Sequence, residues 1–189
     1  GNSHFGLEDI AVMRSIPNIN VICPSDNLEL KKILNDCSKF NRGPSYIRLT
    51  GVPGSPNVYE KDFKYKYGSS QTILNGKDIL LIGIGSVVAE AKKACENLKN
   101  KNIGVKLINA VQIKPLDKKI YKLIKDYDKI MTIEEHTTFG GLGSVVSEII
   151  SKNFLKKKLA KISLPDKFGP TGDYNYLLDY HKLTSSHII

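Results

Sequence analysis

Two carboxylates and an imidazole, Glu134, Glu135 and His136, directly follow a short apolar run. The run, residues 130–133, is typical of a strand that is buried on both faces of a sheet. Open α/β sheets bind ligands beyond the carboxyl ends of their strands, so these three side chains are candidate site residues. Polar groups at a strand end also commonly cap the next helix or contact water, and the residues alone leave both interpretations open.

A glycine-rich turn, residues 140–143 (GGLG), comes next, and apolar residues then return at helical spacing from residue 145. Free backbone amides at a helix start can hold an anion such as a phosphate. The turn lacks the spacing of a dinucleotide fingerprint and of a phosphate-binding lysine loop. We therefore favour a structural role, in which the glycines let the helix begin close to the sheet.

The elements around this stretch alternate between strands and helices from residue 70 to residue 189. Strands are expected at residues 78–83, 105–109, 130–133 and 160–164, with helices between them and a last helix at 174–180. This order predicts a three-layer α/β domain with a mainly parallel sheet. Residues 1–50 read as helix, strand, helix, strand, with Asp26 a candidate N-cap, and are expected to be the last part of a second α/β domain.

Residues 51–69 are rich in proline and glycine and read as a linker between the two domains. Within it, Phe63, Tyr65 and Tyr67 alternate with two lysines. The alternation predicts a half-buried extended segment that packs on a domain surface. Stacking of these rings on nucleic-acid bases is the alternative, which we disfavour.

The formal charge of +9 raises the question of a nucleic-acid partner. Arginine is the usual reader of phosphates and base edges, yet only Arg14, Arg42 and Arg48 are arginines, and the lysines are scattered. We therefore expect no nucleic-acid partner. We expect no membrane association either, because no run approaches the roughly 18 apolar residues of a membrane span.

Three cysteines, Cys23, Cys37 and Cys95, are widely spaced and form no C-x-x-C pair. We expect three buried thiols in a reducing, cytoplasmic location. The chain starts at Gly1, and its first residues resemble the inside of a motif, so we expect it to be part of a longer protein.

Four stretches carry a family resemblance: GNSHFGLEDIAVMRSIPN, PSDNLELKKIL, EEHTTFGGLGSVVSEI and FGPTGDYNYLLDYHKLT. Together they resemble the transketolase family of thiamine diphosphate enzymes over nearly the whole chain. The resemblance implies that residues 1–50 end a pyrimidine-binding domain and that residues 70–189 are the transketolase C-terminal domain. It implies ketol transfer between sugars by a homodimer that uses thiamine diphosphate and Mg²⁺.

In this family the diphosphate domain, the metal ligands and the cofactor-activating glutamate would all lie upstream of Gly1. The resemblance therefore assigns no metal ligand to this chain, and no tightly bound cofactor is expected on the chain alone. His4 is the exception, since it resembles the histidine that faces the reactive carbon of the cofactor. It is the catalytic and cofactor-binding candidate, and its imidazole titrates near neutral pH, as proton transfer requires. Without the resemblance, a solvated histidine near a chain terminus is the simpler interpretation.

Two departures from the family pattern concern the substrate. Asn2 and Ser3 replace a Pro-Thr pair before His4, and Gly51 occupies the position of a phosphate-binding arginine. Arg48 lies three residues earlier and is expected to project from the opposite face of an extended strand, so it is not expected to substitute. Binding of a substrate phosphate is therefore in doubt.

Three other functions remain open. One is 1-deoxyxylulose 5-phosphate synthase, a close relative that shares much of the pattern, and another is the beta subunit of a 2-oxo-acid dehydrogenase. The third is a dimerisation or interaction domain without activity. Ketol transfer that appears only after the upstream half is added would separate the enzymes from the third alternative.

Overall fold

The computed structural model of the chain describes residues 6–50, 56–60 and 63–189. Its main sheet has five strands, of which all but the first are parallel to one another. The order across this sheet is β3 (Gln71–Leu74), β5 (Val105–Asn109), β4 (Ile79–Gly83), β7 (Lys129–Thr137) and β8 (Lys158–Leu164). The expected mainly parallel α/β sheet is thus confirmed.

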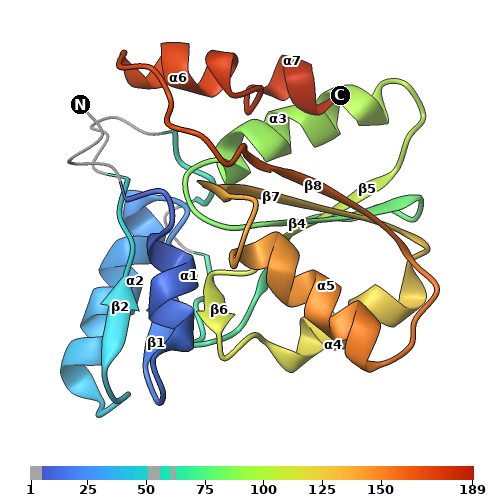
Figure 1. Ribbon diagram of the computed structural model, residues 1–189. Coiled ribbons are helices and arrows are strands. Elements are labelled where there is room, and N and C mark those ends of the chain that lie inside the picture. The colour runs from blue at the N-terminus through green and yellow to red at the C-terminus, as the bar shows by residue number, and fades with distance from the viewer. Residues whose placement is uncertain (1–5, 51–55, 61–62) are drawn as a thin grey trace.

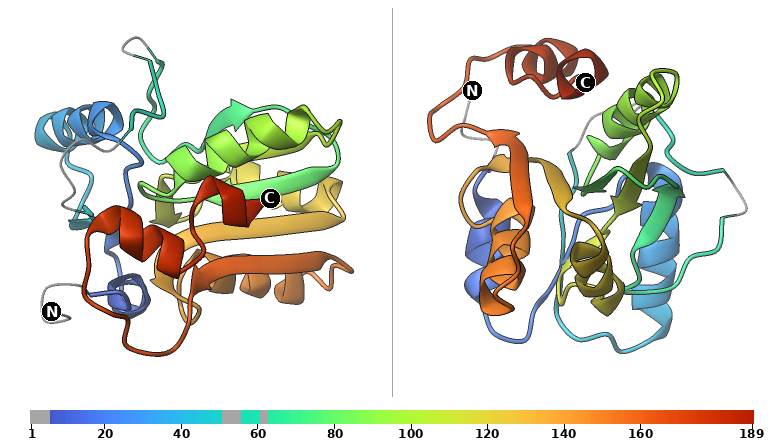
Figure 2. Two further views of the ribbon diagram at one scale, coloured as in Figure 1. Left: turned by 90° about the horizontal axis from the view of Figure 1, so that it is seen from above. Right: turned by 90° about the vertical axis from the view of Figure 1, so that its right-hand side faces the viewer.

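Helices cover both faces of this sheet, which gives three layers (Figures 1 and 2). One face carries α3 (Val88–Lys99), α6 (Tyr174–Tyr180) and α7 (Ser185–Ile188), and the other carries α4 (Lys118–Asp126) and α5 (Leu142–Lys152). Side chains alternate between the two layers along each strand. On β4, Leu80 and Ile82 pack with α4 and α5, whereas Leu81 packs with α3.

The N-terminal segment lies beyond the carboxyl edge of the main sheet (Figures 1 and 2). It comprises α1 (Asp9–Ser15), β1 (Asn20–Ile22), α2 (Asn27–Lys39) and β2 (Ser45–Ile47). In the described part of the chain, β1 lies between β2 and β6 (Gln112–Lys114) in a second, three-stranded sheet. The N-terminal segment and the C-terminal region therefore share a sheet, and Ile10 and Val21 also belong to the core that contains α4 and α5.

The structure departs from the sequence-based expectation at three short elements. Strands β3 and β6 and helix α7 were not predicted, because each has only three or four residues and no apolar run of its own. Strand β7 also continues to Thr137, past the expected end at residue 133. Its pairing with β8 shifts register between Ile133 and Thr137. Polar residues extend this strand in the interior because each has a hydrogen-bond partner, as described below.

One local prediction is confirmed, and a second is confirmed in part but wrong for Cys37. Phe63, Tyr65 and Tyr67 are half-buried while Lys64 and Lys66 are exposed, so the segment packs by alternate side chains as expected. The two tyrosines pack against the cluster formed by Ile22, Ile33 and Val111. Cysteine burial is confirmed for two of the three thiols, since Cys23 and Cys95 are buried and Cys37 is partly exposed, and all three are free. In the described residues, no helix is long and apolar enough to cross a membrane.

Asp26 joins the start of α2 to residues 58–59. Its Oδ1 accepts the Glu29 amide at 2.8 Å, which confirms it as the N-cap. Its Oδ2 accepts the amides of Val58 and Tyr59 at 2.8 and 3.0 Å. The carboxylate is 7% exposed. One buried side chain therefore satisfies three backbone donors and fixes residues 58–59 against α2.

Glu29 extends this polar network to the main sheet. Its Oε2 accepts both the amide and the hydroxyl of Ser25, at 2.8 and 2.9 Å, and also Asn109 Nδ2 at 3.0 Å. Asn109 ends β5, so the fully buried Glu29 ties α2 to the carboxyl edge of the main sheet. Burial raises the pKa of Glu29, against the effect of these hydrogen bonds.

We expect Asp26→Ala to lower the free energy of unfolding by about 3 kcal/mol, from the lost cap and two unsatisfied buried amides. Asp173→Ala is the matched control, because Asp173 is exposed and caps α6 through the Tyr176 amide at 3.0 Å. That loss should be about 1 kcal/mol. Urea unfolding followed by circular dichroism measures both values, and equal losses would contradict the junction role of Asp26.

Candidate functional site

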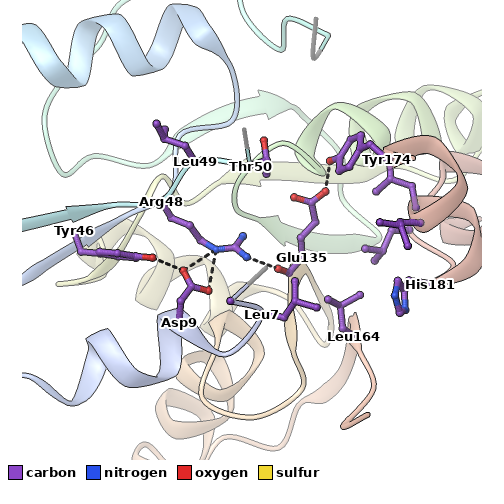
Figure 3. A pocket seen from close by; sticks show the side chains of 14 residues that line it. Leu7, Asp9, Tyr46, Arg48, Leu49, Thr50, Glu135, Leu164, Tyr174 and His181 are labelled. Carbon is purple, nitrogen blue, oxygen red and sulfur yellow. Dashed lines mark hydrogen bonds and ion pairs between the residues drawn. The ribbon is translucent and has the colours of Figure 1, made fainter. Parts of the chain in front are cut away.

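A pocket of about 580 Å³ opens where the N-terminal segment, β7, β8 and α6 come together (Figure 3). Strands β7 and β8 reach it with their carboxyl ends, which is where open α/β sheets carry their sites. The volume lies within the range of small-molecule sites, roughly 300–1,000 Å³. Its wall is formed by Gly6, Leu7, Asp9, Tyr46, Arg48, Leu49, Thr50, Glu135, Leu164, Tyr174, Leu177, Leu178, His181 and Leu183.

An ion pair holds one side of the pocket together. Arg48 Nε donates to both carboxylate oxygens of Asp9, at 3.1 and 3.0 Å, and its Nη2 donates to the Glu135 carbonyl at 2.9 Å. Tyr46 donates its hydroxyl to Asp9 Oδ2 at 2.7 Å (Figure 3). Burial and the hydrogen bond to Asp9 raise the pKa of Tyr46 to about 12, so its hydroxyl stays protonated. The guanidinium thus links α1, the end of β2 and β7.

The Glu135 side chain extends from this ion pair toward Tyr174 (Figure 3). Its Oε2 accepts the Ser86 hydroxyl at 2.8 Å, and its Oε1 accepts the Tyr174 hydroxyl. Burial first, and then the Glu135 carboxylate, raise the pKa of the Tyr174 phenol, which therefore remains a donor at neutral pH. The result is a carboxylate held in place by hydroxyls from α6 and from the loop before α3.

Glu134 points away from the pocket and occupies the start of α5. Its carboxylate accepts the amides of Leu142 and Gly143 at 2.6 and 2.8 Å. A Cβ on Gly141 would lie 2.1 Å from Glu134 Oε2, so a side chain at that position would displace the carboxylate. Gly140 has a φ of +76°, which also favours glycine. The free amides after the glycine turn are therefore occupied by the protein's own carboxyl group.

His136 is fully buried and acts as a structural link. Its Nε2 accepts the Ala11 amide at 3.3 Å, so the ring proton is on Nδ1, which donates to the Thr137 carbonyl at 2.8 Å. Burial lowers the pKa of His136, which keeps the ring neutral at pH 7. Thr137 in turn donates its amide to the Leu7 carbonyl at 2.8 Å. Residues 7 and 11 are thus bound to the end of β7.

The structure assigns different roles to the three polar residues that end the apolar run. Glu134 caps a helix, Glu135 faces the pocket and His136 anchors α1. His4 and Gly51 lie outside the described residues, although the neighbouring Gly6 and Thr50 line the pocket. Asp9, Tyr174 and the pairing of Arg48 were not predicted from the sequence. The available signal was that acidic and hydroxyl residues lie near the ends of expected elements. Their neighbours in the sequence did not indicate that these side chains contact one another.

This arrangement can bind and orient a ligand through fixed charges and hydroxyls. It does not offer a cradle for a diphosphate group. The glycine turn could have bound an anion through free amides, but Glu134 occupies these amides. The charge of Arg48 is neutralised by Asp9. In the described part of the chain, no group of three or more His, Cys, Asp or Glu side chains is placed to hold a metal ion.

Comparison with known families identifies both parts of the chain. Residues 1–51 match the family model described as the transketolase pyrimidine binding domain, and residues 68–188 match the transketolase C-terminal domain. A protein of Methanocaldococcus jannaschii described as a putative transketolase C-terminal section is 36% identical over the whole chain, which covers 59% of that relative.

A second relative is the 1-deoxy-D-xylulose-5-phosphate synthase of Natranaerobius thermophilus, 33% identical over the whole chain, which covers 30% of that enzyme. Among solved structures, a split-gene transketolase described as an inactive beta4 tetramer superposes with a TM-score of 0.88 at 31% identity. That match covers the whole chain and 60% of the other. The chain therefore spans about 60% of two of these relatives and 30% of the third.

Glu134 generates a prediction about pH. Its folded-state pKa is raised to about 7 by burial, despite the two amides and the nearby charges of Arg48 and Lys161. Between about pH 4.5 and 7 the folded protein therefore holds a proton that the unfolded chain has released. The contribution of Glu134 to the free energy of unfolding consequently falls as the pH rises through this range. The full change is about 3 kcal/mol.

We expect Glu134→Gln to remove this decrease in the free energy of unfolding with pH. His136 contributes an increase with pH, because its pKa is lowered. The measured quantity is therefore the difference in the free energy of unfolding between the native protein and the variant. Chemical unfolding at pH 5, 6, 7 and 8 should show the stability advantage of the native protein shrinking as the pH rises. Glu96→Gln, at an exposed site on α3, is the control. A constant difference across this range would contradict the assignment.

Proposed function

The chain belongs to the transketolase family, and we propose that it is the C-terminal portion of an enzyme that transfers a two-carbon ketol unit between sugars. The observation that carries this proposal is the match to two adjacent domain models, in order, over nearly the whole chain. The fold supports it, because the carbonyl of Leu7, three residues after His4 in the sequence, accepts the Thr137 amide at the end of β7.

We propose a division of the chain into the end of a pyrimidine-binding domain (1–50), a linker (51–69) and a C-terminal domain (70–189). Thiamine diphosphate and Mg²⁺ would belong to the complete enzyme, where the cofactor supplies the carbon nucleophile. The described residues offer no diphosphate cradle, so the groups that hold the cofactor are expected on the N-terminal half. His4 is proposed to move protons to and from the substrate hydroxyls.

The principal partner in this proposal is the N-terminal half of the enzyme, on the same or on a separate polypeptide. The similar solved structure is of a split-gene transketolase, and its title describes the beta4 tetramer as inactive. By analogy, this chain alone should be inactive, and the complete enzyme should be a homodimer of complete units. The three free thiols support a reducing, cytoplasmic location.

A second candidate is 1-deoxy-D-xylulose-5-phosphate synthase. It is favoured by the 33% identity to the enzyme of N. thermophilus over the whole chain. The two candidates differ in product. Formation of 1-deoxy-D-xylulose 5-phosphate by the complete assembly would select the synthase, whereas ketol exchange between two sugars would select the transketolase.

The proposed role of His4 is tested by reconstitution with the matching N-terminal half, thiamine diphosphate and Mg²⁺. We expect ketol transfer by the assembly and none by either half. His4→Asn should lower kcat by about 10²–10⁴-fold, the usual contribution of a general acid or base. His187→Asn, on the exposed face of α7, is the matched control and should leave the rate unchanged. An inactive complete assembly would favour a non-catalytic interaction domain, and full activity of His4→Asn would remove His4 from the mechanism.

Gly51 leads to a prediction about substrate phosphate. Glycine cannot form the paired, charge-assisted hydrogen bonds of an arginine, and Arg48 is committed to Asp9 and the Glu135 carbonyl. We therefore expect the complete enzyme to distinguish weakly between matched phosphorylated and unphosphorylated donors. Gly51→Arg should shift kcat/KM toward the phosphorylated donor by about ten- to a hundredfold, as expected for a bond of about 1.5–3 kcal/mol. A strong phosphate preference in the native enzyme would assign the phosphate contact to another residue.

A further inference from the structure

The charges that line the pocket do not cancel. Asp9 and Glu135 supply two carboxylates, and Arg48 supplies one guanidinium. His181 adds no charge at neutral pH, because burial, and then Lys167, lower its pKa. The wall therefore carries a net negative charge, which opposes an anionic ligand and favours a cationic one.

Arg48 is not free to act as an anion receptor. Its side chain is mostly buried, and it forms an ion pair with Asp9 through Nε as well as a bond to the Glu135 carbonyl. A ligand carboxylate approaching the guanidinium would meet a charge that is already neutralised. It would also lie near Asp9 and Glu135, which repel it.

Glu135 is in the opposite situation. The residue is 7% exposed, and its carboxylate accepts two hydroxyl hydrogen bonds, from Ser86 and Tyr174. Within residues 6–50, 56–60 and 63–189, no ion pair joins it to a lysine, arginine or histidine. Hydroxyls stabilise a buried carboxylate less than a cation does, and each oxygen retains a lone pair. A ligand with an ammonium group would supply the missing charge.

Leucines are the most numerous residues in the rest of the wall, which also includes Tyr46, Thr50, Tyr174 and His181. The leucines come from two elements, β8 and α6, and from three loops, and Figure 3 shows Leu7 and Leu164 beside Glu135. The leucines of the wall are Leu7, Leu49, Leu164, Leu177, Leu178 and Leu183. The leucine surface offers no hydrogen-bond partner and favours a compact hydrocarbon body.

We propose that this pocket binds a primary amine with a compact apolar body, whose ammonium group is placed by the Glu135 carboxylate. This site goes beyond the proposed ketol transfer, whose sugar substrates do not match the leucine wall. The proposal does not depend on the upstream half, so it is tested on the 189-residue chain itself.

The probes are 4-phenylbutylamine, 4-phenylbutan-1-ol and 4-phenylbutanoate, which share one body and differ in the charge of the head group. Titration calorimetry and ligand-observed NMR at pH 7 measure their affinities. We expect the amine to bind at least tenfold more tightly than the alcohol, and the carboxylate to show no saturable binding. Tightest binding of the carboxylate, equal affinities, or no binding by any probe would overturn the proposal.

Glu135→Gln keeps the size of the side chain and removes its charge. We expect the amine to lose its advantage over the alcohol, whose own affinity should change by less than about threefold. Glu148→Gln, at an exposed glutamate that pairs with Arg14, is the control and should keep the tenfold preference. An amine preference that survives in Glu135→Gln would overturn the proposal.

Leu177→Lys gives an independent test in case Glu135→Gln is poorly folded. Leu177 is only partly buried, so the fold should tolerate the substitution, and the new ammonium group can occupy the polar end of the pocket. Amine binding should fall at least tenfold while circular dichroism and the unfolding midpoint stay close to those of the native chain. Unchanged amine affinity in this well-folded variant would place the binding elsewhere.

Discussion

The bond between the Glu134 carboxylate and the first amides of α5 is the interaction on which the carboxyl edge of the sheet depends. It fixes the helix directly against the end of β7 and requires glycine at position 141. With the helix in this place, β7 continues as far as Thr137, where its amide bonds to Leu7 and its neighbour His136 bonds to Ala11. The position of α1, and with it one wall of the pocket, follows from this internal helix cap.

Because of this bond, the neighbouring carboxylates of Glu134 and Glu135 have different roles. Glu134 is directed into the protein, where two aligned amides compensate part of its burial. Glu135 points to the other face of the strand, as the alternation of a strand requires, and reaches the pocket. Arg48 then closes the opposite side by joining Asp9 of α1 to the Glu135 carbonyl. The pocket is thus built from contacts of one strand end with segments on either side of it in the sequence.

The features that depend on interactions between residues close in the sequence were predicted correctly. The N-cap at Asp26, the strands around the apolar runs and the alternation from Phe63 to Tyr67 depend on near neighbours, and all were found. The pairing of Arg48 with Asp9 and of Tyr174 with Glu135 joins residues 39 positions apart in each case. No periodicity encodes such a contact. The extension of β7 was missed for a related reason, since buried polar residues are acceptable in a strand only when distant partners satisfy them.

The antiparallel pairing of β6 with β1 has a consequence for synthesis on the ribosome. Ile22 and Gln112 are partners in this pairing, although about 90 residues separate them. At about 5–20 residues per second, β1 waits several seconds before its second neighbouring strand is made. During that interval β1 presents an edge with unpaired backbone groups, the usual template for association between nascent chains. Its short length, three residues, limits how far such an association can extend.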